Sequence, residues 1–162
     1  MAAEVGQPAP EFQLEGIDRG AGGAGSVQSF SLADFRGSPV VLVFYPGDST
    51  PVCTRQLNSY TEGIDSFASV GAQVLAISPQ SVESHEEFSC QQGGFAFPLL
   101  ADTDKAVGEA YGILGPLGFY RRSVFVIDGE GVVRYAHRAV AGLTFRSTDD
   151  LVAAVRSASA QT

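Results

Sequence analysis

Cys53 stands where the sequence predicts the start of a helix. It follows Thr50 and Pro51, a pair typical of helix starts, because the threonine hydroxyl can accept a hydrogen bond from an unpaired backbone amide and proline lacks an N–H that would go unused in the first turn. The free amides and the positive end of the helix dipole favour the thiolate over the thiol at this place. Since the thiolate is the reactive form of cysteine, Cys53 is a candidate nucleophile.

The apolar residues after Cys53 predict on which side of the helix its sulfur lies. Four of them follow at spacings of three and four residues: Leu57, Tyr60, Ile64 and Phe67. This pattern is typical of one amphipathic helix, and Cys53 begins its apolar stripe, so its side chain is expected to face a sheet and to sit in a pocket. A cysteine in such a stripe is also commonly a small core residue without chemistry, and spacing alone leaves both interpretations open.

The second cysteine, Cys90, lies in a helix predicted over residues 82–92, which ends before Gly93. Hydrogen bonds at a helix end break easily, which suits a thiol that has to move. Two cysteines this far apart are too few for a disulfide framework, and with the two histidines they give no four-ligand zinc spacing. We therefore expect two reduced thiols and no metal.

Three continuous apolar, β-branched runs are typical of strands buried on both faces of a sheet, at residues 39–45, 73–78 and 123–127. Two short strands are expected around Phe12 and Phe30. The glycine-rich stretch between them, residues 20–25, predicts a flexible surface loop.

The elements between these strands determine the class of fold. A hairpin around Asp128 and Gly129 leads into a strand at residues 132–137. Further helices are expected at residues 104–111 and 148–157. Alternating strands and helices interrupted by a hairpin predict an α/β fold with a mixed central sheet and helices on both faces, in one domain of residues 1–162.

The composition excludes several classes of protein. The chain has 162 residues, 44% of them hydrophobic, and a formal net charge of -8. It has enough apolar material for a core, which argues against a disordered tail. Its acidity argues against nucleic acid and anionic membranes as partners. Without a predicted signal peptide or membrane span, we expect a cytoplasmic protein.

The residues around Cys53 resemble those of a known family. Pro46, Thr50 and Cys53 match the Pro-x-x-x-Thr-x-x-Cys signature of peroxiredoxins, and Arg122, directly before the strand at 123–127, matches an arginine that the family places beside its reactive cysteine. Residues 6–12, 97–102 and 111–112 are similar to the peroxiredoxin Q or bacterioferritin comigratory protein branch. The resemblance implies a thioredoxin-like fold and reduction of hydroperoxides by cysteine, without metal, flavin or haem as a cofactor.

The resemblance also implies a role for each matched residue. Cys53 would attack the peroxide, and Thr50 and Arg122 would supply fixed hydrogen-bonding groups where charge develops. A guanidinium suits this task because it is always charged and presents several N–H groups in one plane. Pro46 would shape and shield the pocket. Arg121 is expected to lie on the opposite face of the strand, as a surface charge.

Two positions depart from the branch. Gln56 stands where glutamate is usual, and Asn58 stands where the commoner resolving cysteine would be. Cys90 resembles the resolving cysteine of the branch's other subgroup. This implies a Cys53–Cys90 disulfide within one chain, reduced by thioredoxin or a similar dithiol, in a monomer or weak homodimer. An external thiol resolving Cys53 is the alternative.

Other functions stay open at this stage. A thioredoxin-fold thiol–disulfide oxidoreductase would normally carry a Cys-x-x-Cys pair, which is missing at Cys53. A redox-sensing binding domain would need no turnover. A cysteine hydrolase would need His85 or His137 as a base, and both are expected to be solvated surface residues. The apolar residues 113–120 would form either a rim admitting organic hydroperoxides or ordinary loop packing.

Overall fold

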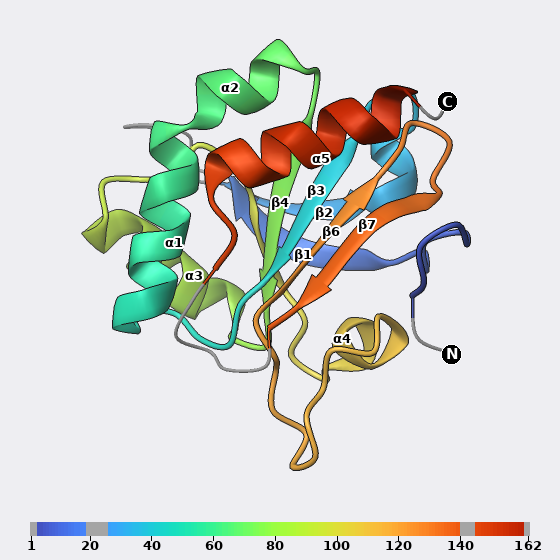
Figure 1. Cartoon of the computed structure of the whole chain (residues 1–162). Coiled ribbons are helices and arrows are strands. Elements are labelled where there is room, and N and C mark those ends of the chain that lie inside the picture. Colours follow the sequence, from blue (N-terminus) through green and yellow to red (C-terminus); the bar gives the residue numbers. More distant parts are fainter. Residues whose placement is uncertain (1–2, 19–25, 140–144, 161–162) are drawn as a thin grey trace.

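The computed structural model describes residues 3–18, 26–139 and 145–160. In this part of the chain one mixed sheet has the strand order β2-β1-β5-β4-β3-β6-β7 (Figure 1). The strands are β1 (Gln13–Asp18), β2 (Ser26–Ser31), β3 (Val40–Phe44), β4 (Gln73–Ser78), β5 (Leu99–Ala101), β6 (Ser123–Ile127) and β7 (Val133–Arg138). The helices are the 3-10 helix η1 (Leu32–Phe35) and the α-helices α1 (Pro51–Glu62), α2 (Ile64–Ser69), α3 (Val82–Gln91), α4 (Ala106–Ala110) and α5 (Thr148–Ala160).

The three predicted buried strands lie side by side. Strand β3 pairs in parallel with β4 and antiparallel with β6, and every residue of β3 and β6 is buried. Strand β7 returns antiparallel along β6 after the predicted hairpin. The sheet is therefore mixed, as the sequence predicts.

Alternate side chains of these strands build two cores. Val41 and Val43 of β3 face a core that also receives side chains from α1, α2, α3 and α5. Leu42 and Phe44 face a second core, to which η1, α4 and the N-terminal segment contribute. Because strand side chains alternate between faces, one apolar run supplies both cores. Helices cover both faces, which confirms the α/β prediction.

The helix predicted from Cys53 to Phe67 is two helices. The break lies at Gly63, between α1 and α2, where a Cβ atom would stand 2.5 Å from Cγ2 of Thr148 at the start of α5. This close approach requires glycine. The hydrophobic spacing continues across the break, which is why the sequence predicts one helix.

Smaller differences lie elsewhere. Strand β5 is only three residues long, too short for its pattern to predict it. The helix expected at 104–111 is shorter, spanning Ala106–Ala110. The two short strands expected near Phe12 and Phe30 are present as β1 and β2, which pair antiparallel. The glycine-rich stretch between them lies outside the described residues. No helix of the described part is long and apolar enough to cross a membrane.

Candidate active site

The helix start predicted at Cys53 is present. Thr50 occupies the N-cap position in an extended conformation, and Pro51 is the first residue of α1. Cys53 therefore lies in the first turn. Its side chain is completely buried and belongs to the core under α1, together with Tyr45 and Leu57. The sulfur thus faces the sheet, as the apolar stripe predicts.

The predicted cap by the Thr50 side chain is wrong. Its hydroxyl makes no cap hydrogen bond and donates instead to the backbone carbonyl of Gly47, over 3.1 Å. This bond closes the turn that leads from β3 into α1, in which Ser49 has a positive φ of 62°. Because the hydroxyl hydrogen is used on Gly47, the oxygen keeps its lone pairs for another donor.

Arg122 lies directly beside the sulfur. Its neighbour Ser123 pairs with Phe44 across the β3–β6 ladder, which brings the end of one strand to the start of the other. Nη2 of Arg122 donates to Sγ of Cys53 over 3.2 Å, and the residue is 4% exposed. Arg121 turns away, and its guanidinium donates to the carbonyl of Ala139.

Gln56 holds the guanidinium in place. Its side-chain oxygen accepts a hydrogen bond from Nη1 of Arg122, and its amide donates to the Tyr60 hydroxyl over 3.2 Å. The Tyr60 hydroxyl donates to the carbonyl of Arg146 over 2.6 Å, and burial raises the pKa of Tyr60 to about 12. Since Gln56 is neutral, it orients Arg122 without cancelling the positive charge beside Cys53.

The other two predicted residues, Pro46 and Cys90, are exposed. Pro46 is exposed in the loop after β3. Cys90 is exposed near the end of α3, and both cysteines are free. The two thiols are thus separate in this structure, one inside the protein and one at its surface.

The prediction that His85 is a solvated surface residue is wrong. His85 is completely buried, with Nδ1 2.8 Å from Oδ2 of Asp48 and Nε2 2.9 Å from the carbonyl oxygen of Leu100. The other histidine, His137, is half-buried and its Nδ1 faces Nη2 of Arg146 at 3.3 Å. Because both nitrogens of His85 are engaged, it cannot serve as the base of a cysteine hydrolase.

Asp48 and Tyr45 belong to the same network and were not among the predicted site residues. The Tyr45 hydroxyl donates to Oδ1 of Asp48 over 2.7 Å. Burial, with Asp48 close by, raises the pKa of Tyr45 well above its usual value. The signal that could have revealed this network is the three-residue spacing of His85 and Phe88, which places both on the buried face of α3.

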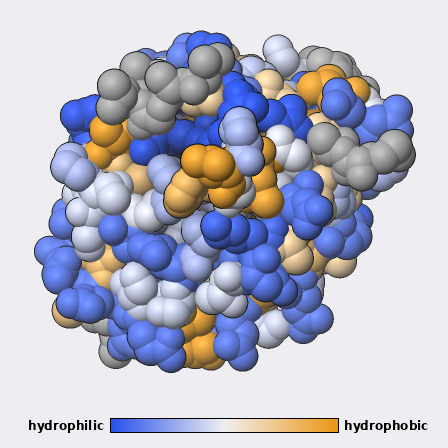
Figure 2. Space-filling view, turned by 90° about the horizontal axis from the view of Figure 1, so that it is seen from below, coloured by the Kyte–Doolittle hydropathy of each residue, from blue (hydrophilic) through white to orange (hydrophobic). Residues whose placement is uncertain are grey.

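Residues 113–120 form the loop between α4 and β6. Ile113 and Tyr120 are buried, whereas Leu117 and Phe119 are 83% and 67% exposed. This loop projects at the lower end of the molecule in Figure 1. Seen from that end, Figure 2 shows hydrophobic atoms standing out near the middle of a largely polar face. The loop is thus only partly packed.

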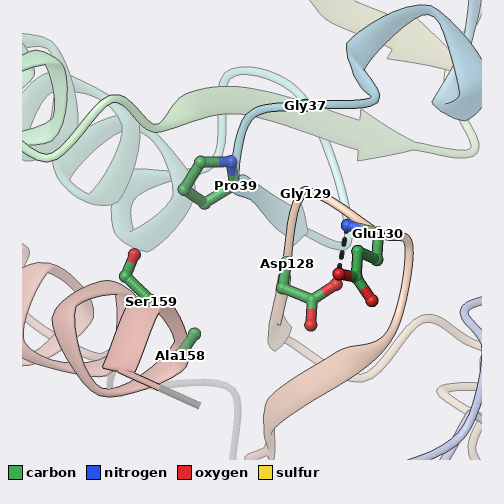
Figure 3. A pocket seen from close by; sticks show the side chains of 7 residues that line it. All are labelled: Gly37, Pro39, Asp128, Gly129, Glu130, Ala158 and Ser159. Carbon is green, nitrogen blue, oxygen red and sulfur yellow. Dashed lines mark hydrogen bonds between the residues drawn. The ribbon is translucent and has the colours of Figure 1, made fainter. Parts of the chain in front are cut away.

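A hollow of about 340 Å³ lies at the end of the sheet opposite the loop at residues 113–120 (Figure 3). It is lined by residues before β3, after β6 and at the end of α5: Gly37, Pro39, Asp128, Gly129, Glu130, Ala158 and Ser159. The Asp128 carboxylate accepts hydrogen bonds from the backbone amides of Glu130 and Val132 and from Arg134. That carboxylate therefore fixes the β6–β7 turn. The described residues contain no cluster of three or more histidine, cysteine or acidic side chains suited to a metal ion.

Comparison with known proteins assigns the chain to a protein family. Residues 5–136 match the model of the AhpC/TSA family. The bcp protein of Coxiella burnetii, which carries a provisional peroxiredoxin name, is 36% identical over 140 residues, covering 82% of this chain and 87% of the relative. A thioredoxin peroxidase of Echinococcus granulosus is 36% identical over 141 residues, covering 83% and 70%.

The fold agrees with this assignment. The reduced 2-Cys peroxiredoxin of Plasmodium vivax superposes with a TM-score of 0.85 at 25% identity, over 97% of each chain. The thioredoxin-like fold, the buried Cys53 at a helix start and the arginine at its sulfur thus occur together with the family match. The chain belongs to the AhpC/TSA family, the peroxiredoxins.

Proposed function

We propose that this protein is a thiol-dependent peroxidase that reduces hydrogen peroxide and organic hydroperoxides with Cys53. The observation that carries the proposal is the 3.2 Å contact between Nη2 of Arg122 and Sγ of Cys53 inside the protein. At this distance the always-charged guanidinium donates a hydrogen bond to the sulfur that would attack as the thiolate. A thiolate is the nucleophile that cleaves an O–O bond.

In the first step the Cys53 thiolate attacks one peroxide oxygen. An S–O bond forms to the oxygen that carries the hydrogen, and the O–O bond breaks. The second oxygen leaves as hydroxide or alkoxide and takes a proton from water, giving water or an alcohol. Cys53 is oxidised to the sulfenic acid while the peroxide is reduced. Arg122 donates hydrogen bonds to the attacking sulfur and to the oxygen on which negative charge grows.

Thr50 and Pro46 would orient the peroxide at the sulfur. Since the Thr50 hydroxyl donates to Gly47, its oxygen is left to accept the O–H of the hydroperoxide. Pro46 would limit access from its exposed place in the same loop. The neutral Gln56 keeps Arg122 aimed at the sulfur.

In the second step Cys90 resolves the sulfenic acid. The Cys90 thiol loses its proton and attacks Sγ of Cys53, an S–S bond forms, and the S–O bond breaks; the hydroxide takes up a proton and leaves as water. Because Cys90 is exposed and Cys53 is buried, we expect the end of α3 to unwind first. A dithiol such as thioredoxin then reduces the disulfide and is itself oxidised, in line with the name of the Echinococcus granulosus relative.

We also propose where and in what form the protein works. The cytoplasm keeps thiols reduced at rest, which the cycle requires. The predicted single domain carries both cysteines, so a monomer or weak homodimer would complete the cycle without a thiol from a partner.

The test is mass analysis after one equivalent of hydrogen peroxide. We expect the wild type to lose two hydrogens and to yield linked Cys53 and Cys90 peptides, whereas Cys90→Ser gains one oxygen on Cys53. Cys53→Ser is expected to abolish peroxide consumption with a thioredoxin system. Turnover retained in Cys53→Ser would refute the peroxidase, and a disulfide between chains, or a lasting sulfenic acid in the wild type, would refute resolution by Cys90.

A further inference from the structure

The Asp48 carboxylate collects hydrogen bonds inside the protein. Oδ1 accepts from the Tyr45 hydroxyl over 2.7 Å, and Oδ2 accepts from the Ser84 hydroxyl over 2.7 Å. Nδ1 of His85 lies 2.8 Å from Oδ2. The side chains of Asp48 and His85 are only 3% and 0% exposed. Solvent therefore contributes almost nothing to this pair.

Both ring nitrogens of His85 have partners. The carbonyl oxygen of Leu100 is only an acceptor, so Nε2, at 2.9 Å, carries a hydrogen. Nδ1 faces Oδ2 of Asp48 at 2.8 Å and the Tyr45 hydroxyl at 3.3 Å. His85 is thus held at both edges of its ring, by the loop before α1 and by strand β5.

This pair joins the two segments that carry the thiols. Asp48 lies in the loop between β3 and α1, ahead of Cys53, and its backbone amide also donates to the Gln80 side chain before α3. His85 lies in the first half of α3, and Cys90 follows near the end of that helix. The pair therefore fixes the loop before Cys53 to the N-terminal half of α3, the helix that carries Cys90.

A buried polar pair is weak evidence for stability, because its hydrogen bonds replace hydrogen bonds to water. We interpret this pair as a requirement for one arrangement of the chain. Here that arrangement is the loop with Thr50, whose conformation sets the place of the peroxide.

We propose that His85 and Asp48 are positioning residues for the peroxidase reaction. The pair holds the loop at residues 46–50 in the shape that accepts the peroxide. It also confines the unwinding of α3 to the residues after His85. Cys90 can then move while the N-terminal half of the helix stays in place. This inference rests on the proposed function.

The test uses the Cys90→Ser background, so that sulfenic acid formation at Cys53 is measured without resolution. His85→Gln should slow sulfenic acid formation about three- to tenfold. It should raise hydrogen exchange together in residues 46–53 and 82–88, and leave α5 unchanged. His137→Gln removes the other histidine and is the matched control, expected to change neither the rate nor the exchange.

A second variant separates positioning from simple loss of stability. His85→Gln leaves the buried Asp48 side chain without its bond to Nδ1, whereas Asp48→Asn with His85→Gln places two amides there that can hydrogen-bond to each other. We expect the double variant to form sulfenic acid faster than His85→Gln alone, because the effects of substituting two residues in contact do not simply add.

The outcomes are separable. If the parent protein forms no sulfenic acid, the proposed function fails, while hydrogen exchange still tests whether the pair holds residues 46–53 and 82–88. Equal rates, or equal exchange, in His85→Gln and the parent would overturn the inference. A double variant no faster than His85→Gln would overturn it as well.

Discussion

Asn58 of α1 is hydrogen-bonded to Gln92, the residue that caps the end of α3. Nδ2 of Asn58 donates to Oε1 of Gln92 over 3.0 Å, and Cys90 lies just before this cap. The residue that stands where the branch usually has its resolving cysteine thus contacts the end of the helix that carries Cys90. This bond must break when α3 unwinds.

Asn58→Ala is therefore expected to speed disulfide formation. Loss of one hydrogen bond, worth about 0.5–1.5 kcal/mol, raises the unwound population about two- to tenfold. Rapid quenching after one equivalent of peroxide, followed by mass analysis of the Cys53–Cys90 linkage, measures the rate. Gln92→Ala should give the same increase.

The neighbouring Gln91 provides the control for this pair. It is exposed, and its amide lies 3.5 Å from Glu87 within the same helix, so Gln91→Ala should leave the rate unchanged. An equal increase in Gln91→Ala would mean that any loss at the helix end is enough and that the Asn58 contact has no special part.

Arg122→Met is expected to lower the rate of sulfenic acid formation about 100- to 1,000-fold, because it removes the fixed donors at the sulfur. The rate of Arg122→Lys should lie between those of the wild type and Arg122→Met, since lysine keeps the charge and loses the planar pair of donors. Quenched-flow mixing with a probe that reacts with sulfenic acid measures the rate. Arg121→Met is the matched control and should stay within about twofold of wild type; a comparable loss there would contradict the assignment.

Thr50 offers a test of how the peroxide is oriented. Thr50→Ser keeps the hydroxyl that donates to Gly47 and should retain most of the rate. Thr50→Val keeps the shape and loses the oxygen, and we expect a fall of about 10- to 100-fold in the second-order rate with peroxide. Equal rates in both variants would show that the hydroxyl has no part in the reaction.

The strands and the helix start could be predicted because their signals are local. The apolar runs of β3, β4 and β6 and the pair Thr50 and Pro51 need no knowledge of distant residues. The contact of Arg122 with Cys53 depends on the pairing of β3 with β6, which no local pattern shows. It was predicted only through the family resemblance.

The predictions for the Thr50 cap and for a solvated His85 are wrong for physical reasons. Thr50 has two possible partners within one turn, an amide of α1 and the carbonyl of Gly47, and sequence does not decide between them. His85 was expected in solvent because histidine is polar. Its buried place depends on Asp48 and the Leu100 carbonyl, which come from two other segments of the chain.

Tyr60 predicts a specific dependence of stability on pH. Burial raises its pKa to about 12 in the folded protein, against about 10 in the unfolded chain. Below pH 10 Tyr60 keeps its proton in both the folded and the unfolded protein, so its full contribution to the free energy of unfolding is present. Between pH 10 and 12 the unfolded state releases its proton first, so the free energy of unfolding falls by about 3 kcal/mol on account of this group.

Tyr60→Phe cannot lose this contribution. At pH 8 the variant should be less stable than wild type by about 1–3 kcal/mol, because Gln56 and the Arg146 carbonyl lose their partner. The difference should shrink as the pH rises above 10. Urea unfolding from pH 8 to 11 measures it, and the other buried tyrosines affect both proteins equally. A constant difference across that range would show that Tyr60 ionises alike in the folded and unfolded states.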